Sequence, residues 1–567
     1  MKDVKFSLIF IFCIFVLLSL GITYRLFILQ IKNGDYWQAI AKGQQTFIEE
    51  SVGERGDFFL EDKDNNRKIL AQNIKKNILY VISSKIEDKN KTAEILENIL
   101  EKPKDEILLE IEKGETFKKE INDEQVKEFR KNCNNIKGLY VDEIQKRFYP
   151  QNSLASSLIG FVNEAGDGQS GIEGYFNEII KGTEGFKEQE RSPWGFLTLF
   201  SNGNKGLNSP EHGSDLVLTL DYNIQFFCEK ELKQAKEKWD IDAGEIIVME
   251  PATGKIISLA TFPTFNPNKY GEETNLEIFR NASTQKLFEP GSVFKAITMA
   301  AALEENLITP ETTYIDKGFV DLGGPLIYNY EKRVWGKQTM TNVLEKSINT
   351  GAVFVQQKLG TKLFLKYLEK FGLFEKTGID LQAEEFSLNE SLKNGYPRDF
   401  ASASFGQGIN VTSMQLIRAF SAIANGGNLM KPYIVEKIIK PNGEEIEIKP
   451  EIERRVISKE TSDKLTLMLV SVTEDIYARR AQVNGYFVAG KTGTAQVPLE
   501  EGGYSKDKTI HTFMGYLPSD DPKFLILVKL ENPKGASASS YSAAPLFSEI
   551  AKYIVNLWQI PPEREAL

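Results

Sequence analysis

PGSVFKAITMAAAL, at residues 290–303, places a serine and a lysine three positions apart at the start of an apolar run. Pro290 and Gly291 predict a helix start there, and the run after them can be buried. On a helix, Ser292 and Lys295 share one face and lie within reach of each other. Because burial disfavours the charged lysine, its amine can accept the serine proton. In the first turn, free backbone N–H groups can also face an oxyanion.

The same spacing occurs nine residues earlier, in Ser283-Thr-Gln-Lys286. Ser283 lies in a polar stretch that ends at Pro290, whereas Ser292 opens an apolar run that can hold its side chains still. We therefore predict that Ser292 is the nucleophile. On this motif alone, an ordinary helix-start serine with an exposed Lys295 remains an open alternative.

A second candidate pair, Ser347 and Asn349, lies in TNVLEKSINTGAVFVQQKLG, for which we predict a helix over about residues 341–359. A second hydroxyl there could relay a proton, and an amide could hold a peptide carbonyl or the lysine. A loop or cap pair is the open alternative. The matching pair Ser387 and Asn389 lies in an acidic polar run and is expected at the surface.

The third motif is Lys491-Thr492-Gly493-Thr494, between FVAG and AQV. It is typical of a strand whose glycine lets a ligand approach the backbone. Such an edge could bind an extended peptide, while the lysine and threonines grip a carboxylate. The similar KTG at residues 376–378 follows a helical run, so its glycine is predicted in a turn.

Beyond residue 214 the predicted elements are strands broken by helical blocks, without strict βαβ alternation. They are a strand at 216–220, a helix at 222–239, a hairpin of 244–249 and 255–260, a helix after Pro290, β-rich runs at 486–497, 512–518 and 523–532, and a closing helix near 545–557. This order favours an α+β domain on a largely antiparallel sheet.

The N-terminal part has a different character. Residues 6–24 carry no charge and would span roughly 28 Å as a helix, enough to cross a membrane. A cleaved signal peptide is the alternative, and the flanking charges leave orientation open. Runs such as 85–115 predict solvated amphipathic helices, and residues 182–214 are rich in Gly, Ser, Asn and Pro. We expect a tail at 1–5, an anchor helix at 6–30, one domain at 31–214 and another at 215–560.

Composition excludes several function classes. The chain has 567 residues and a formal net charge of -10, which argues against nucleic-acid binding. It has two histidines, His212 and His511, and three scattered cysteines, so a zinc cluster or disulfide framework is not expected. Catalysis should therefore use Ser, Lys, Asp, Glu or Tyr, with neither a metal nor an organic cofactor.

In order along the chain, the three motifs are Ser-x-x-Lys at 292, Ser-x-Asn at 347 and Lys-Thr-Gly at 491. With them the chain resembles the class B penicillin-binding proteins, monofunctional peptidoglycan D,D-transpeptidases, and is most similar to the septal branch. The resemblance covers about residues 215–560 and extends to FPTFNPN at 262–268, EPGSVFK at 289–295, SFGQG at 404–408, ANGG at 424–427, AGKTGTAQ at 489–496 and AAPLF at 543–547.

The resemblance implies the penicillin-binding serine transpeptidase fold, an antiparallel sheet flanked by helices, above a pedestal domain. It implies that Ser292 attacks the penultimate D-alanine carbonyl of a stem pentapeptide while Lys295 takes its proton. Ser347 would relay a proton and Asn349 would position the substrate amide. The remaining implied roles are an oxyanion hole from the N–H groups of Ser292 and Thr494, and carboxylate binding by Lys491, Thr492, Gly493 and Thr494.

The resemblance also implies a single-pass protein of the bacterial cytoplasmic membrane, with its catalytic domain outside. Expected partners are peptidoglycan stem peptides, β-lactams as inhibitors, a membrane-embedded glycosyltransferase and other division proteins. Arg55-Gly56, residues 147–150 and residues 171–173 resemble inter-domain motifs with a structural role. Three alternatives remain open: an elongation transpeptidase, a β-lactam sensor or hydrolase, and an inactive scaffold.

Overall fold

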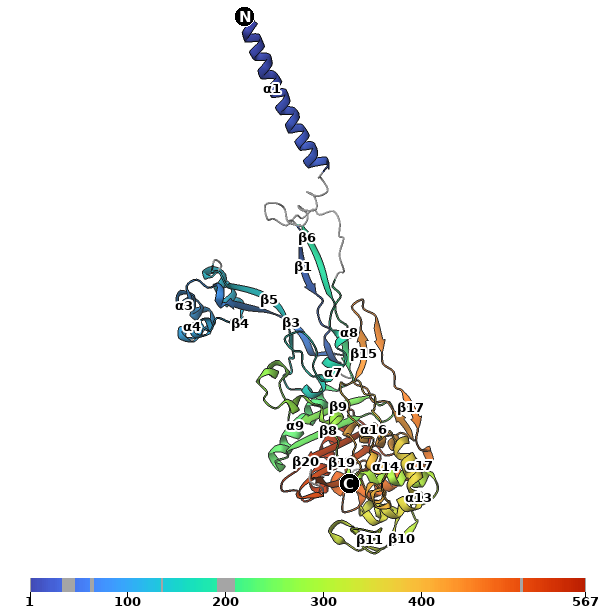
Figure 1. The fold of residues 1–567 in the computed structure, drawn as a ribbon. Coiled ribbons are helices and arrows are strands. Elements are labelled where there is room, and N and C mark those ends of the chain that lie inside the picture. The colour runs from blue at the N-terminus through green and yellow to red at the C-terminus, as the bar shows by residue number, and fades with distance from the viewer. Residues whose placement is uncertain are drawn as a thin grey trace. The chain divides into compact units, whose positions relative to one another are not determined.

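A computed structural model describes residues 2–32, 46–61, 66–133, 136–190, 210–499 and 503–565. The chain divides into two compact units (Figure 1). One unit contains residues 1–54 and 182–213, and the other contains residues 55–181 and 214–567. The predicted linker at 182–214 lies partly outside the described residues.

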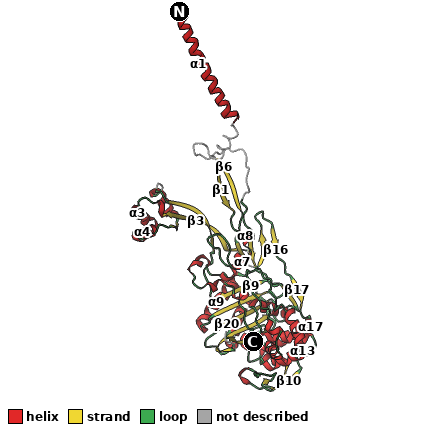
Figure 2. Ribbon diagram, viewed as in Figure 1, coloured by secondary structure: helices red, strands yellow, loops and turns green. Residues whose placement is uncertain are grey.

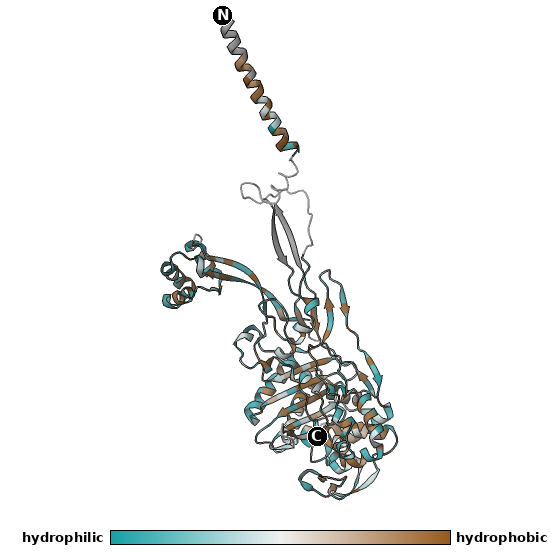
Figure 3. Cartoon of the chain, in the orientation of Figure 1, coloured by the Kyte–Doolittle hydropathy of each residue, from teal (hydrophilic) through white to brown (hydrophobic). Residues whose placement is uncertain are grey.

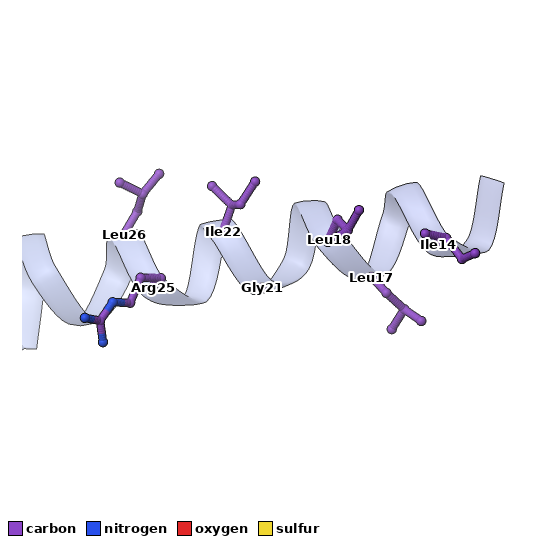
Figure 4. A pocket seen from close by; sticks show the side chains of 7 residues that line it. All are labelled: Ile14, Leu17, Leu18, Gly21, Ile22, Arg25 and Leu26. Carbon is purple, nitrogen blue, oxygen red and sulfur yellow. The ribbon is translucent and has the colours of Figure 1, made fainter. Parts of the chain in front are cut away.

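The first unit contains an apolar helix and a strand pair. Helix α1, Lys2–Phe27, continues into one π-helical turn at Ile28–Lys32. Residues Phe10–Lys32 have a mean hydropathy of 2.3 and are long and apolar enough to cross a membrane (Figure 3). A hollow on α1 lies at Gly21, between apolar side chains and Arg25 (Figure 4). Strands β1 and β6, Thr46–Val52 and Glu184–Glu190, pair antiparallel.

The second unit begins with a seven-stranded sheet. Its strand order is β16-β15-β7-β2-β3-β4, with β5 also paired to β3. The strands are β2 Phe58–Glu61, β3 Arg67–Ile82, β4 Thr116–Ile121, β5 Leu139–Phe148, β7 Asp215–Leu218, β15 Val435–Ile439 and β16 Glu445–Glu447. Because β2 and β7 pair in parallel, segments from before and after residues 182–213 share one sheet.

Three helices pack against the C-terminal part of β3. Helices α3 Lys89–Leu100, α4 Lys104–Glu112 and α5 Asp123–Asn132 bury one apolar face each against β3, β4 and β5. Leu96 and Ile111 are fully buried in this small core, while the charged faces are solvated. The helices predicted within residues 85–115 are confirmed, with a break at Pro103.

The five-stranded sheet lies at the centre of the second unit, in the order β18-β19-β20-β8-β9. All neighbours are antiparallel, and β8 and β9 form the predicted hairpin. The strands are β8 Ala243–Met249, β9 Ile256–Phe262, β18 Ala489–Pro498, β19 Tyr504–Leu517 and β20 Phe524–Glu531. Strand β18 is at the edge of the sheet.

Helices cover both faces of this sheet, so its strands are apolar on both sides (Figure 2). Along β8, Ile246 and Val248 belong to one core, whereas Ile247 and Met249 belong to the other. Helices α9 Tyr222–Trp239 and α18 Ala543–Leu557 cover the first side. Helices α11 Lys295–Glu304, α16 Ser413–Ala424 and α17 Lys459–Glu474 cover the second. The α+β class predicted from the sequence is confirmed.

The motifs expected to be structural lie together in one buried ionic cluster. Glu173 is fully buried and accepts hydrogen bonds from Arg55 Nε and Arg147 Nε, both at 2.7 Å. Tyr149 OH donates to the same carboxylate at 3.1 Å. The two guanidinium groups and the hydroxyl surround one carboxylate, so the cluster ties three segments of the chain together.

Candidate active site

Ser292 lies at the start of the central helix of the second unit. A single 3-10 turn, Gly291–Phe294, leads into α11, so Ser292 lies in the first turn as predicted. Gly291 has a φ of +61°, which favours glycine, and its N–H donates to Gly406 O at 3.0 Å. Lys295 Nζ lies 2.9 Å from Ser292 Oγ. The Ser-x-x-Lys spacing therefore produces the predicted contact.

The surroundings of Lys295 favour its neutral amine. Burial, together with the nearby positive charge of Lys491, holds the pKa of Lys295 well below its usual range. Its Nζ donates to two obligate acceptors, Ser347 O at 2.6 Å and Asn349 Oδ1 at 2.8 Å. A neutral amine has only two hydrogens, so its lone pair is left to accept the proton of Ser292.

The prediction of a single helix over residues 341–359 is wrong, because a break at residues 346–348 divides it. The structure has α12 Met340–Glu345 and α13 Asn349–Lys370, separated by three residues. Ser347 between them has a φ of +53°, in the left-handed region that is unfavourable for a serine. The break directs both the carbonyl and the hydroxyl of Ser347 to Lys295, at 2.6 and 3.2 Å. The contacts with Lys295 accompany this strained conformation.

Asn349 is oriented from both ends of its amide. Its Nδ2 donates to Tyr328 O at 3.0 Å, which leaves Oδ1 to accept from Lys295. Tyr328 is in β12, Ile327–Tyr328, and acts through its backbone, so its side chain gave no sequence signal. The predicted pair Ser347 and Asn349 therefore lies at the lysine, with Ser347 in the connection between α12 and α13 and Asn349 at the start of α13.

Lys491 brings the third motif to the same point. Its Nζ donates to Ser347 Oγ at 3.1 Å and to Thr492 O at 3.1 Å, and lies 3.4 Å from Thr492 Oγ1. It is fully buried, and burial lowers the pKa of Lys491 to about 7. The hydroxyl of Ser347 thus lies between two lysine amines, each with a lowered pKa.

The glycine of the third motif also has a packing role, which the sequence did not predict. A Cβ on Gly493 would lie 3.1 Å from Pro290 O and 3.2 Å from Val293 N. Because it lacks a Cβ, the glycine lets edge strand β18 approach the turn that carries Ser292. Thr494 Oγ1 accepts from Ser539 N at 3.1 Å and also lies 3.1 Å from Ser539 Oγ. Ser539 was missed because its Ser/Ala-rich segment signals only a loop.

The competing Ser-x-x-Lys motif does not form a pair. Ser283 is fully buried and donates to Glu245 Oε2 at 3.0 Å. Lys286 is half exposed and pairs with Glu531 at 2.7 Å. The preference for Ser292 over Ser283 agrees with this geometry, since only Ser292 has an amine beside its hydroxyl.

The other two competing motifs also lie elsewhere. Asn389 was predicted at the surface but is buried. Its side-chain Nδ2 donates to Asn410 O, and its Oδ1 accepts from Asn410 N, so the backbone of Asn410 satisfies the buried carboxamide. In the segment 376–378, the backbone and hydroxyl of Thr377 donate to Glu384, and Gly378 has a φ of +73°. Both segments are structural turns.

A serine–histidine pair is present but inaccessible. His511 Nδ1 lies 2.7 Å from Ser542 Oγ, and both residues are fully buried. Burial lowers the pKa of His511 to about 4, so the imidazole stays neutral within the core. Across the described ranges of the chain, no group of three or more His, Cys, Asp or Glu is placed to hold a metal ion.

Glu289 links two of the motif segments behind the nucleophile. Its Oε1 accepts from Gly408 N at 3.0 Å and from Tyr504 OH at 3.3 Å. Burial raises the pKa of Glu289. Its Oε2 is buried without a hydrogen-bond partner in the described part of the chain. Glu289 and Gly408 thus join the segments EPGSVFK and SFGQG, a contact that the sequence did not predict.

Two protein families match most of the chain. Residues 244–552 match the family described as penicillin binding protein transpeptidase domain, and residues 51–218 match the penicillin-binding protein dimerisation domain. The first match includes all three motifs of the site.

Individual relatives and solved structures agree with these matches. The chain is 32% identical to stage V sporulation protein D of Bacillus subtilis over 97% of its own length and 85% of that protein. It is 28% identical to the peptidoglycan D,D-transpeptidase FtsI homolog of Mesostigma viride over 95% and 93% of the two chains. Penicillin binding protein 3 of Mycobacterium tuberculosis, complexed with aztreonam, is 26% identical, with a TM-score of 0.70 over 92% of this chain and 99% of that one.

Proposed function

The chain belongs to the class B penicillin-binding proteins and is a peptidoglycan D,D-transpeptidase; we propose that it cross-links stem peptides through an acyl-enzyme on Ser292. The observation that carries this proposal is the 2.9 Å approach of Ser292 Oγ to a buried lysine amine that has its hydrogens committed elsewhere.

The first half of the reaction forms the acyl-enzyme. Lys295 accepts the proton of Ser292 as its Oγ attacks the penultimate D-alanine carbonyl. The backbone N–H groups of Ser292 and Thr494 stabilise the oxyanion. Lys491, with Thr492 and Thr494, binds the terminal carboxylate. Ser347, whose hydroxyl lies between both amines, passes a proton to the departing D-alanine.

The second half transfers the acyl group to an amine. A neighbouring stem peptide supplies the amine, which attacks the ester carbon and loses a proton through Ser347 and Lys295. Ser292 then leaves and regains its own proton. Asn349 positions the donor amide throughout, because its carboxamide is held between Lys295 and Tyr328 O. β-Lactams imitate the dipeptide and leave a stalled ester on Ser292.

The cellular role proposed for the chain is septal wall synthesis at the bacterial cytoplasmic membrane. Helix α1 would be a single anchor, with residues 1–5 in the cytoplasm and the catalytic domain outside. The pedestal would extend over residues 31–214 and the transpeptidase domain over residues 215–560, supported by the two family matches. A membrane-embedded glycosyltransferase and other division proteins would be its partners.

Labelling with a fluorescent penicillin tests the proposal. We expect the full-length protein in detergent to form a stable adduct that Ser292→Ala abolishes. The matched control is Ser283→Ala, which has the competing spacing but no amine, and it should keep the adduct. Absence of an adduct in folded wild type would contradict Ser292 as an activated serine. Rapid decay of the adduct would instead indicate a hydrolase.

A further inference from the structure

A polar pocket of about 460 Å³ adjoins the catalytic cluster. Asn349 and Tyr328 form part of its wall, and the hydrogen bond between them links the pocket to Lys295. Helix α15, Pro397–Ala403, contributes Arg398 and Ser402, and Tyr504 closes another side. A ligand held at Asn349 would therefore extend directly into this pocket.

Arg398 is the one cation among the described residues that line the pocket. Among the residues that the structure describes, its guanidinium has no ion pair and no hydrogen-bond acceptor. The buried arginines Arg55 and Arg147, in contrast, are both paired with Glu173. Asp399 also lines the pocket, and its Oδ2 accepts from Tyr396 N at 2.8 Å. It forms no salt bridge with Arg398. The pocket thus offers a planar donor group that has no paired acceptor among the described residues.

A guanidinium presents its donors in a rigid fork that matches a carboxylate. The terminal carboxylate of the donor peptide already has a cation, because the proposed function assigns it to Lys491, which does not line the pocket. A second cation in the adjoining pocket therefore fits a second carboxylate on the same peptide.

We propose that Arg398 binds a carboxylate on the side chain of the donor stem peptide, at the residue that precedes the D-alanyl-D-alanine end. This rests on the proposed function, because Asn349 must hold the donor amide for that residue to reach the pocket. Arg398 selects donor stems that carry a side-chain carboxylate at this residue over stems that carry none there.

Two synthetic thioester donors test this selection. In both, a mercapto acid replaces the terminal D-alanine, so the terminal carboxylate is kept and thiol release reports turnover. The donors differ only in whether the side chain before D-alanine carries a carboxylate. The full-length protein is compared with Arg398→Gln, Arg398→Lys and the control Arg280→Gln, an exposed arginine that pairs with Glu277 and lies outside the pocket.

For the carboxylate-bearing donor, we expect Arg398→Gln to lower kcat/KM by about 10- to 100-fold. Arg398→Lys, which keeps the charge without the fork, should fall between Arg398→Gln and wild type. The donor that lacks the carboxylate should show less than a ~3-fold change in any variant, and Arg280→Gln should match wild type with both donors. If Arg398→Gln lowered kcat/KM equally for both donors, or for neither, the subsite would be overturned.

Penicillin labelling of Ser292 in each variant separates this result from the proposed function. Wild type that forms no adduct contradicts the acyl-enzyme proposal and the subsite together. Benzylpenicillin could acylate wild type and Arg398→Gln at equal rates while kcat/KM falls equally for both donors. In that case only the subsite is wrong.

Discussion

Ser347 Oγ lies 3.1 Å from Lys491 Nζ, although the two residues are 144 positions apart in the sequence. The same hydroxyl is 3.2 Å from Lys295 Nζ. This bridge joins the second and third motifs at the amine that activates Ser292. The hydroxyl that both lysines share thus belongs to a residue with a left-handed backbone.

Replacing Ser347 separates its chemical role from its backbone strain. Ser347→Ala and Ser347→Gly both remove the relay hydroxyl, so each should lower the acylation rate by about 100-fold or more. Glycine adopts φ +53° without the Cβ clash, so Ser347→Gly should be more stable than Ser347→Ala by about 1 kcal/mol. Stopped-flow acylation and urea unfolding measure the two effects. Equal stability of both variants would contradict the strain.

Acylation should depend on pH through the two lysines. Lys295 must be neutral to accept a proton. Because its pKa is lowered, it stays neutral at pH values well below the usual lysine pKa of about 10.4. Lys491 must be charged to attract a carboxylate, and the free enzyme loses that charge as pH rises through about 7. We therefore expect the second-order acylation constant, which reports free-enzyme groups, to fall above neutral pH. A constant that rises steadily to alkaline pH would refute this assignment.

Gly493→Ala should slow acylation by displacing the nucleophile. The added Cβ would lie 3.1 Å from Pro290 O and 3.2 Å from Val293 N, so β18 and the Ser292 turn must separate by a few tenths of an ångström. We expect about a 10-fold lower acylation rate, because small misplacements at reacting groups are costly. Gly271→Ala is the control, since its Cβ meets nothing within 4 Å. Equal rates for the two variants would show that the close approach is unimportant.

Glu173→Gln should destabilise the second unit without reaching the catalytic groups. It removes the carboxylate between Arg55 and Arg147, and leaving buried charges without their partner costs about 3–5 kcal/mol. The exposed pair of Lys75 and Glu143 is the control, and Glu143→Gln should change stability by less than about 1 kcal/mol. Urea midpoints measure both. A Glu173→Gln midpoint as high as that of the control would mean that the cluster contributes little.

Several elements were predictable because their signals are local. The helix at Tyr222–Trp239 and the β8–β9 hairpin follow from residue periodicity and turn residues, which depend on neighbours in the sequence. The first two motifs were chosen over their copies by the polarity of the flanking residues, and the third because its copy follows a helical run. The structure pairs Ser292 rather than Ser283 with a lysine.

Other features escaped local patterns. The break between α12 and α13 runs against a helical periodicity, and Asn389 is buried despite an acidic, polar segment. In both cases distant partners, Lys295 and Asn410, override the preference of the segment.

The sequence by itself determined the candidate residues for the chemistry, since a serine and a lysine three apart at a helix start can share one face. Of the two pairs with this spacing, Ser292 and Lys295 meet, whereas Ser283 and Lys286 do not. The sequence also determined the apolar length of α1 and the β-rich runs that form the strands of the central sheet. Only the tertiary structure decided that Lys491 reaches Ser347 and that Tyr328 O orients Asn349. It also decided that Arg398 lines the adjoining pocket with no ion-pair partner among the described residues. These contacts join residues far apart in the chain, and long-range contacts are set by the packing of whole elements rather than by spacing along the sequence.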